Sequence, residues 1–254
     1  VIEINPNLTK EIQVTLDDYV QYGLRKGITI TKKQLHIFEK HIDSEQLYQR
    51  CLRKLSLKDR TIYEMRKWLK ETELADYQEV NALIDKLIQK GYLDDEKLCI
   101  EQIQALSNSL YGPKQIISKL KQRGIKEDCI LACMEQSKIK EYDYALAYAT
   151  KALKQSQKSS VIKTKNTIRN KLMTRGYSNS VIDKVILELD YSSNKENEDV
   201  LLEKLIKKAI KRYERKYQGY DLKTRIYRYC LTQGFHSEDI SVLMDRMEWS
   251  HDED

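Results

Sequence analysis

The residues with the most distinctive chemistry in this sequence are lysines and arginines without acidic neighbours. No aspartate or glutamate occurs from Tyr144 to Ile182, where eight basic residues lie, and ten basic residues face two acidic ones from Lys204 to Arg228. Each stretch carries a net charge of +8, and because the whole chain totals +6, the remainder carries −10. Helices with many internal ion pairs mix both signs along their length, so this separation favours a surface that binds a polyanion.

A solvated basic face without a partner is the alternative interpretation of these stretches. We expect the partner or nucleic acid to contact cations from both of them. The predicted contact residues are Lys151, Lys154, Lys158, Lys163, Lys165, Arg169, Lys171, Arg175, Lys204, Lys207, Lys208, Lys211, Arg212, Arg215, Arg225 and Arg228.

Tyrosines interleave with the second basic stretch, and the chain has seventeen tyrosines against two phenylalanines. A tyrosine beside basic residues can stack on an exposed base or anchor a protein interface. It can equally pack half-buried between helices with its hydroxyl in water. The sequence leaves these roles open for Tyr213, Tyr217, Tyr220, Tyr227 and Tyr229.

Residues that could perform catalysis form no catalytic arrangement. The four histidines are scattered, without an HExxH motif, and no GxxxxGK[ST] loop is present to hold a nucleotide. Asp94 and Asp95 follow Gly91 and precede a helical pattern, where carboxylates typically cap backbone amides. We therefore expect a protein that is not an enzyme, has no catalytic residue and uses no cofactor.

The five cysteines are odd in number and contain no CxxC pair. Cys129 and Cys133 are four residues apart, which places them on one face of a helix. Two thiols without a nearby histidine are too few for a structural zinc site, which takes four ligands. We expect no metal site and predict that all five are buried, reduced and packed as small apolar residues.

The elements that position these residues are predicted to be helices. Leu, Ile, Lys, Glu and Gln dominate, and only two prolines interrupt the chain. Near the N-terminus, alternating apolar residues around Asn5-Pro6-Asn7 predict a short hairpin. A helical pattern from about Asp17 to Lys40, broken near Gly23 and Gly27, completes a small N-terminal module.

A repeat follows, anchored on Gly124, Gly176 and Gly234, which are 52 and 58 residues apart. Apolar residues recur four and eight residues before each glycine and one, six and nine residues after it. This spacing describes two amphipathic helices joined by a tight turn, where glycine accepts a left-handed conformation. Capping or acidic residues, such as Ser178 and Glu127, fall at the start of the second helix of the pair.

A less regular copy precedes these three, with Glu73 in the glycine slot, and another helical stretch precedes each helix pair. We therefore predict an all-α fold, an elongated curved array of tandem three-helix repeats that stack to cover their apolar stripes. The predicted domains are an N-terminal hairpin/helix module at 1–43, repeat 1 at 44–91, repeat 2 at 92–138, repeat 3 at 139–190, and repeat 4 with an acidic tail at 191–254.

No apolar run approaches the roughly 20 residues needed to cross a bilayer, and no signal-peptide pattern opens the sequence. We expect a cytoplasmic protein that is a monomer and has no membrane partner.

Three segments give the chain a resemblance to a known family. Gly91-Tyr92-Leu93-Asp94-Asp95-Glu96 closes the first repeat, Tyr111-Gly112-Pro113-Lys114 opens a later helix, and Tyr22-Gly23-Leu24-Arg25-Lys26-Gly27 lies near the N-terminus. Together with the glycine register, they make nearly the whole chain resemble RecX, the bacterial regulatory protein of the RecA recombinase. The family's arginine-serine lead-in to the first repeat is replaced here by 57–61, and the first repeat's glycine is absent.

The resemblance implies a function in DNA repair, homologous recombination and the SOS response. Members of the family bind in the groove of the RecA filament on single-stranded DNA and limit its assembly, ATPase activity and strand exchange. The residues leave two other functions open. One is a general nucleic-acid-binding repeat protein with direct DNA contact, and the other is a protein–protein scaffold whose basic face meets an acidic partner.

Overall fold

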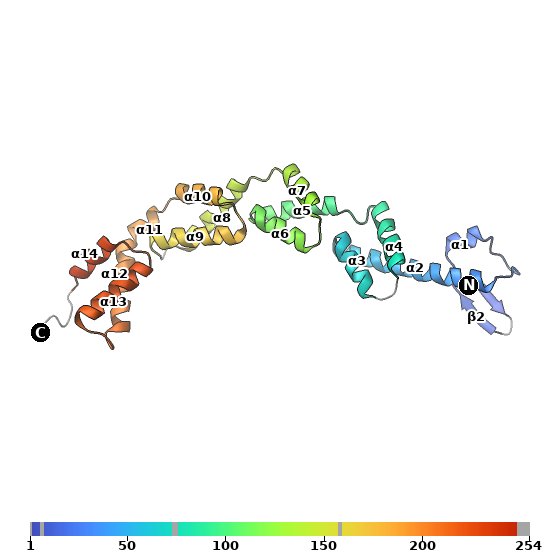
Figure 1. Ribbon diagram of the computed structural model, residues 1–254, viewed down its shortest axis with the longest axis horizontal. Helices are drawn as coiled ribbons and strands as arrows, with labels where there is room; N and C mark the ends of the chain where they lie inside the picture. The colour runs from blue at the N-terminus through green and yellow to red at the C-terminus, as the bar shows by residue number, and fades with distance from the viewer. Residues whose placement is uncertain (1, 6–7, 73–75, 157–158, 248–254) are drawn as a thin grey trace. The chain divides into compact units, whose positions relative to one another are not determined.

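The computed structural model describes residues 2–5, 8–72, 76–156 and 159–247, which contain fourteen helices and two short strands. The predicted all-helical fold of three-helix repeats is confirmed (Figure 1). Two compact units divide the chain: unit 1 comprises Val1–Gln102 with Lys119–Ser137, and unit 2 comprises Ile103–Ser118 with Lys138–Asp254. The division passes through two helices of the second repeat.

The N-terminal module begins with strands β1 (Ile2–Asn5) and β2 (Leu8–Ile12), which pair antiparallel. Pro6 and Asn7 of the predicted turn lie outside the described residues. Helix α1 (Leu16–Gln21) follows, with the Thr15 hydroxyl accepting the amide of Asp18 at its N-cap.

One 26-residue helix, α2 (Lys32–Leu57), connects this module to the repeats. It begins at a capping box in which Thr31 and Gln34 satisfy each other's backbone amides. The helical pattern predicted up to Lys40 therefore belongs to two helices, separated by a segment in which Gly23 and Gly27 have positive φ. Helix α2 also runs without a break through position 43–44, where the sequence placed the end of the module.

The remaining helices follow the predicted order, with one short addition. They are α3 (Ile62–Glu71), α4 (Tyr77–Gln89), α5 (Asp95–Asn108), α6 (Pro113–Gln122), α7 (Glu127–Gln136), α8 (Glu141–Gln155), α9 (Val161–Arg175), α10 (Asn179–Glu188), α11 (Ser192–Glu196), α12 (Glu198–Tyr213), α13 (Gly219–Thr232) and α14 (Ser237–Asp245). The five-residue helix α11 has no counterpart in the predicted repeat. Glu73, in the predicted glycine slot of the first repeat, lies outside the described residues.

Apolar positions of the predicted register form the cores. In the third repeat, Ile168, Leu172 and Ile182 are fully buried in a cluster that small alanines of α8, such as Ala145 and Ala149, allow to close. Comparable clusters lie among α2, α3 and α4 and among α12, α13 and α14. The first, third and fourth repeats therefore each bury a stripe of side chains of their own, at roughly 25 cal/mol per Å² of apolar surface.

Hydroxyl caps join one repeat to the next. Thr61, the N-cap of α3, donates its hydroxyl to the carbonyl of Arg123 at 2.7 Å, and Ser160, the N-cap of α9, donates to the carbonyl of Gln233 at 2.7 Å. Both carbonyls stand directly before a glycine turn of the following repeat. The start of a middle helix is therefore bonded to the end of the next middle helix in both units.

Backbone packs on backbone where α6 meets α9. The Gly112 amide donates to the Arg175 carbonyl at 2.8 Å, and the Lys114 amide donates to the Gly176 carbonyl at 3.1 Å. A Cβ at Gly112 would lie 2.5 Å from the backbone of Gly176. This close approach gives the glycines of the repeat a second purpose, beyond the left-handed turn that the sequence predicted.

Acidic residues complete the same junctions. The Ile62 amide donates to Asp95 Oδ1 at 2.9 Å, and the Val161 amide donates to Glu198 Oε1 at 3.1 Å. At the junction between them in sequence, Pro113 occupies the first helical position and has no amide hydrogen to satisfy. Asp94 caps α5 through the Lys97 amide at 2.9 Å, as predicted, whereas Asp95 of the same pair accepts the amide of α3 instead.

The prediction that Ser178 caps the second helix of the third repeat is wrong. It stands at the N-cap of α10, but its hydroxyl makes no capping hydrogen bond. Its amide instead donates to Glu141 Oε1 of α8 at 2.7 Å. The predicted acidic residues do occupy the first turns of α7 and α14.

Candidate partner-binding surface

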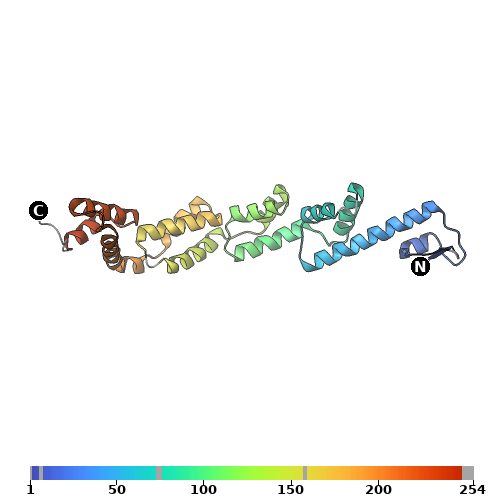
Figure 2. The ribbon, with the colours of Figure 1, turned by 90° about the horizontal axis from the view of Figure 1, so that it is seen from below.

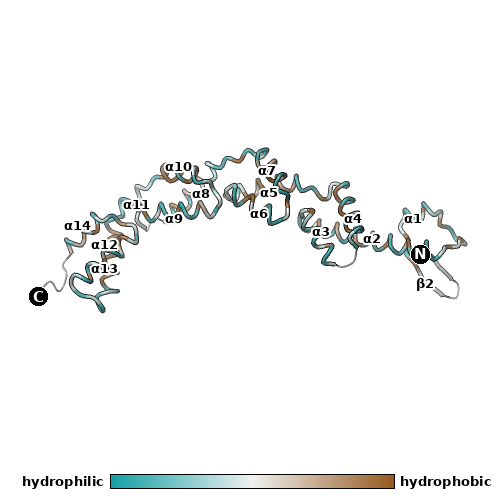
Figure 3. Tube along the Cα trace, in the orientation of Figure 1, coloured by the Kyte–Doolittle hydropathy of each residue, from teal (hydrophilic) through white to brown (hydrophobic). Residues whose placement is uncertain are grey.

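The predicted contact residues lie on four helices of unit 2. In Figure 1, α9 and α13 lie on the lower side of this unit, and α10 and α14 lie on its upper side. Figure 2 shows the molecule from below, from the side of α9 and α13. Hydropathy follows the same division, since α9 is largely hydrophilic and α10 largely hydrophobic (Figure 3). Two predicted residues lie on α8 (Lys151, Lys154), five on α9 (Lys163, Lys165, Arg169, Lys171, Arg175), five on α12 (Lys204, Lys207, Lys208, Lys211, Arg212), one after α12 (Arg215) and two on α13 (Arg225, Arg228). Lys158 lies outside the described residues.

Several of these cations already have partners within the protein. Arg169 forms an ion pair with Asp183 at 2.6 Å, and Lys207 forms one with Glu203 at 2.5 Å. Asp183 is the first residue after the acid-free stretch, one turn into α10. The stretch is therefore free of acids in sequence but not in space.

Arg175 is held by its surroundings. Its guanidinium lies over the rings of Tyr111 at 4.3 Å and Tyr148 at 4.9 Å, and it donates to the Ser109 carbonyl at 3.3 Å. Stacked and bonded in this way, Arg175 ties the start of α6 to α8 and α9. Its contribution is mainly to the junction between repeats.

Other predicted cations are available to a partner. Within the described part of the chain, no intramolecular ion pair or hydrogen bond engages the side chains of seven of them. These are Lys151, Lys154, Lys171, Lys208, Lys211, Arg215 and Arg228, and all but Lys171 are exposed.

Two of these cations, Lys171 and Arg228, each line a hollow of unit 2 that also contains tyrosine rings. One, of about 330 Å³, lies on α9 and is lined by Tyr148, Thr167, Asn170, Lys171, Thr174 and Arg175. The other, of about 530 Å³, lies on α13 and is lined by Tyr213, Tyr220, Asp221, Thr224, Arg225, Arg228, Tyr229 and Thr232. Both combine cations and hydroxyl donors, which contact phosphate, with tyrosine rings, on which bases stack.

Tyrosines of unit 2 differ in their exposure and in their partners. Tyr177 is buried and donates to the Leu110 carbonyl at 3.1 Å, and burial raises the pKa of its phenol. Tyr213 packs edge-on against Tyr229, and Tyr217 lies under Arg225 at 3.8 Å. Tyr220 is 83% exposed and is the tyrosine most accessible to a partner.

Unit 1 contains a similar hollow that the sequence prediction missed. Tyr63, Arg66, Lys67 and Lys70 of α3, with Glu71, line about 390 Å³. Counted back from the glycine slot, Lys67 has the same repeat position as Arg228 on α13. The repeat register was the signal that could have identified it, but acidic residues nearby masked its charge in the sequence.

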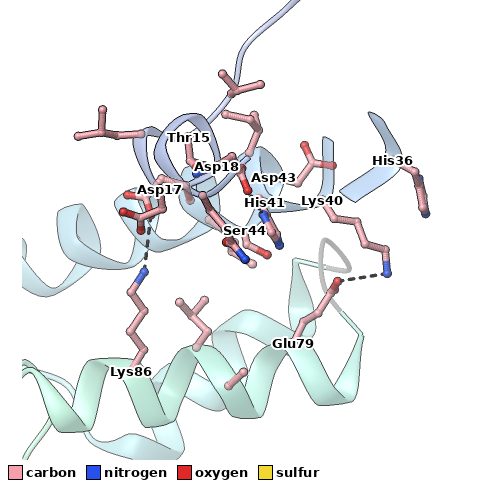
Figure 4. Close-up of a pocket in the computed structure, with 18 residues that line it drawn as sticks. Thr15, Asp17, Asp18, His36, Lys40, His41, Asp43, Ser44, Glu79 and Lys86 are labelled. Atoms are coloured by element: carbon pink, nitrogen blue, oxygen red, sulfur yellow. Dashed lines mark hydrogen bonds and ion pairs between the residues drawn. The ribbon is translucent and has the colours of Figure 1, made fainter. Parts of the chain in front are cut away.

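The largest hollow of unit 1, about 1040 Å³, lies between α1, α2 and α4 (Figure 4). His41 Nδ1 lies 2.7 Å from Asp18 Oδ1, and the Thr15 hydroxyl donates to the other oxygen of Asp18. Burial raises the pKa of Asp18, but the hydrogen bonds from Thr15 and His41 outweigh it and leave the pKa below its ordinary value. Ion pairs of Lys40 with Glu79 and of Lys86 with Glu45, also on this hollow, join α2 to α4.

The cysteines differ from the prediction at one point. Cys51, Cys99, Cys133 and Cys230 are buried, whereas Cys129 is only half-buried. Cys99 also joins Cys129 and Cys133, so three sulfurs come together where the sequence indicated two.

In the described ranges no helix is both long and apolar enough to cross a membrane.

Comparison with known proteins places the chain in a family. No family model matches the sequence. Relatives each called regulatory protein RecX include one from Lactococcus lactis, 30% identical over 191 residues that cover 74% of this chain and 71% of the relative. Another, from Streptococcus agalactiae, is 28% identical over 91% of this chain and 90% of the relative.

A crystal structure of regulatory protein RecX superposes with a TM-score of 0.61 at 25% identity, over 69% of this chain and 87% of that one. RecX from Lactobacillus salivarius gives a TM-score of 0.54 at 25% identity, over 59% of this chain and 98% of that one. The sequence similarity and the shared arrangement of helices together make this chain a member of the RecX family of regulatory proteins.

Proposed function

We propose that this protein is a negative modulator of the RecA recombinase. In this proposal it binds in the groove of the RecA filament on single-stranded DNA and limits filament assembly, ATP hydrolysis and strand exchange. Membership of the RecX family supports the choice of partner. The observation that carries the mode of binding is the set of unpaired cations in unit 2, of which Lys171 and Arg228 line tyrosine-containing hollows.

The chemistry of this surface suits a partner with many regularly spaced anions. Lys151 and Lys154 on α8 and Lys208 and Lys211 on α12 are exposed on long side chains, so they can follow phosphate or carboxylate groups without losing an internal partner. Each phosphate that they neutralise releases condensed counterions, which makes binding sensitive to salt. Arg228 and Tyr220, which both line the α13 hollow, add a hydrogen-bond donor and an exposed ring.

The test is DNA-dependent ATP hydrolysis by RecA, with this protein added in increasing amounts. We expect the rate to fall as the protein approaches stoichiometry with the filament. A triple variant, Lys151→Gln, Lys154→Gln and Lys171→Gln, should require at least tenfold more protein for the same inhibition. A matched variant that removes three exposed lysines of unit 1, Lys33→Gln, Lys90→Gln and Lys97→Gln, should inhibit like the unaltered protein. The proposal is wrong if a stoichiometric excess of this protein leaves the rate of ATP hydrolysis by RecA unchanged.

Direct binding of nucleic acid is the second candidate, favoured by the pairing of arginine, threonine and tyrosine in both hollows. It predicts tight binding of bare single-stranded or duplex DNA at physiological salt. A filament modulator should bind the assembled filament much more tightly than bare DNA. Affinities for both, measured in one buffer, separate the two candidates.

A scaffold that binds an acidic protein is the third candidate. Here charge reversal on α12, at Lys204, Lys207, Lys208, Lys211 and Arg212, would abolish the contact whether or not DNA is present. In all three cases we propose a cytoplasmic monomer without catalytic activity of its own, and light scattering of the purified protein tests the oligomeric state.

A further inference from the structure

Three cysteines of unit 1 bring their sulfur atoms together. Cys129 and Cys133 lie one turn apart on α7, and Cys99 reaches them from α5. All three Sγ atoms lie within 4.8 Å of one another. Among the described residues, no other group of three or more cysteine, histidine or acidic side chains converges closely enough to hold an ion.

Packing alone accounts for the other two cysteines but not for this arrangement. Cys51 and Cys230 are fully buried, each in the apolar core of its own repeat. They show how an isolated thiol behaves here, as a small apolar side chain. A core that needs only small apolar volume has no reason to gather three sulfurs from two helices, one of them half-open to solvent.

The cluster is shielded from solvent on one side and accessible on the other. Cys99 and Cys133 are buried, while half-buried Cys129 leaves one side accessible. The carboxylates of Asp95 and Glu96 lie near Cys129. The three sulfurs would bind an ion as thiolates, and the ion would supply the positive charge that makes their ionisation favourable.

We propose that Cys99, Cys129 and Cys133 form a three-thiolate site for a thiophilic metal ion, and that Zn²⁺ is the ion it fits best. Zinc–sulfur bonds are about 2.3 Å long, so sulfurs that share one zinc lie about 4 Å apart. Small side-chain rotations suffice to reach this separation from the observed arrangement. Soft thiolates select Zn²⁺ or Cu⁺, and the adjacent carboxylates favour the divalent, borderline ion.

Binding would proceed by exchange of protons for the ion. Each of the three thiols releases its proton to solvent as a sulfur–metal bond forms, and no change of oxidation state is involved. The fourth tetrahedral position would take water, which can reach the site at half-buried Cys129. The bound ion would tie α5 to α7, so metal should stabilise the folded chain in a concentration-dependent way. This inference is independent of the proposed effect on RecA.

The test uses the full chain, reduced and metal-free, under anaerobic conditions with a phosphine reductant. Co²⁺ serves as the spectroscopic probe, because thiolate ligands give it strong charge-transfer absorption in the near ultraviolet. We expect this absorption to saturate at one equivalent, to disappear when Zn²⁺ is added, and to be accompanied by proton release. The melting temperature should rise with the concentration of Zn²⁺.

Cys129→Ser is the informative variant, because this side chain is half-buried and its replacement leaves the core intact. It should weaken Co²⁺ binding at least tenfold and reduce the charge-transfer absorption per ion. Cys230→Ala, which alters a buried cysteine outside the cluster, should bind Co²⁺ unchanged, and circular dichroism confirms that both variants are helical. The proposal is wrong if stoichiometric Co²⁺ gives no charge-transfer absorption, or if Cys129→Ser binds as tightly as the unaltered chain.

Discussion

The Arg123 side chain shows how much of a repeat junction can depend on one residue. Its Nε and Nη2 atoms donate to the two carboxylate oxygens of Glu64 at 2.9 and 3.0 Å, and Nη2 also donates to the Asp59 carbonyl at 3.0 Å. Glu64 also accepts the Thr61 amide, completing the capping box of α3. Because both side chains of the pair are largely shielded from solvent, this bidentate contact is stronger than an exposed ion pair.

Replacing Glu64 with glutamine should destabilise the protein by about 1–2 kcal/mol at neutral pH. Burial by itself would raise the pKa of Glu64. The hydrogen bonds from Arg123 and Thr61 lower the pKa by more than burial raises it, so the pKa in the folded state lies below its ordinary value. The carboxylate therefore stabilises the fold above the unfolded pKa of about 4.3, and this contribution is lost as the pH falls through the folded pKa.

Urea denaturation across this pH range measures the effect. The difference between the two proteins should be full at neutral pH and should close in acid. Glu203→Gln is the matched control, because its partner Lys207 is on the exposed face of α12. A difference that is independent of pH would contradict the assigned role of the Glu64 carboxylate.

Helix ends are the elements that define the repeat. The middle helix of one repeat begins against the glycine turn that ends the next middle helix, through Thr61 and Gly124, Gly112 and Gly176, or Ser160 and Gly234. Hydroxyl caps serve two junctions and a Gly-Pro start serves the third. The groups that begin a middle helix thus also bond or pack its repeat against the next one.

Gly176→Ala should be far more disruptive than Gly91→Ala, although both glycines have positive φ, +86° and +73°. Nothing lies within 4 Å of a Cβ at Gly91, so that variant should lose only the roughly 1–2 kcal/mol of the left-handed conformation. A Cβ at Gly176 would lie 2.4 Å from the Gln115 backbone nitrogen and force the junction apart. Denaturant titrations of the two variants provide the comparison, and equal losses would contradict it.

Ser160→Ala isolates the hydroxyl cap. It removes both the bond to the Lys163 amide and the bond to the Gln233 carbonyl, and we expect a loss of about 1–2 kcal/mol in the free energy of unfolding. Ser178→Ala is its control, since Ser178 occupies an N-cap position without a capping bond. Equal stabilities of the two variants would show that the junction bond is unimportant.

For the whole molecule, charge is the property that separates its parts. The two basic stretches lie in unit 2, and the remainder of the sequence is net acidic. Such segregation adds little to folding, because like charges repel, and it is more readily understood as adaptation to a charged partner. Arg175 is less available to such a partner than the unpaired cations, because its guanidinium is stacked on the rings of Tyr111 and Tyr148.

Salt dependence tests this interpretation on any polyanionic partner. The slope of log affinity against log salt should decrease by about one for each phosphate contact that is removed. Lys208→Gln and Lys211→Gln together should therefore lower the slope by up to about two. Arg175→Lys should leave the slope nearly unchanged and reduce thermal stability instead. If the double variant has the same slope as the unaltered protein, Lys208 and Lys211 do not contact the partner.

The sequence by itself determined the helices, the repeat and the residues that fill each core. These follow from local periodicity, from glycine at fixed intervals and from apolar side chains that must leave water, all of which are properties of neighbouring residues. There were three exceptions. Ser178 makes no capping bond at its N-cap position, the short helix α11 has no counterpart in the predicted repeat, and α2 runs unbroken through the predicted end of the N-terminal module. The family was also accessible from sequence, since its short segments around Gly91 and Gly112 are local.

Only the tertiary structure decided which partners these side chains take. Asp183 reaches Arg169 from a different helix, and Cys99 reaches two thiols thirty or more residues away. Such contacts depend on how helices are turned against each other, and small rotations exchange one neighbour for another without altering the hydrophobic pattern. The division of the cations into those held by the fold and those left for a partner is therefore a property of packing, which no spacing along the chain encodes.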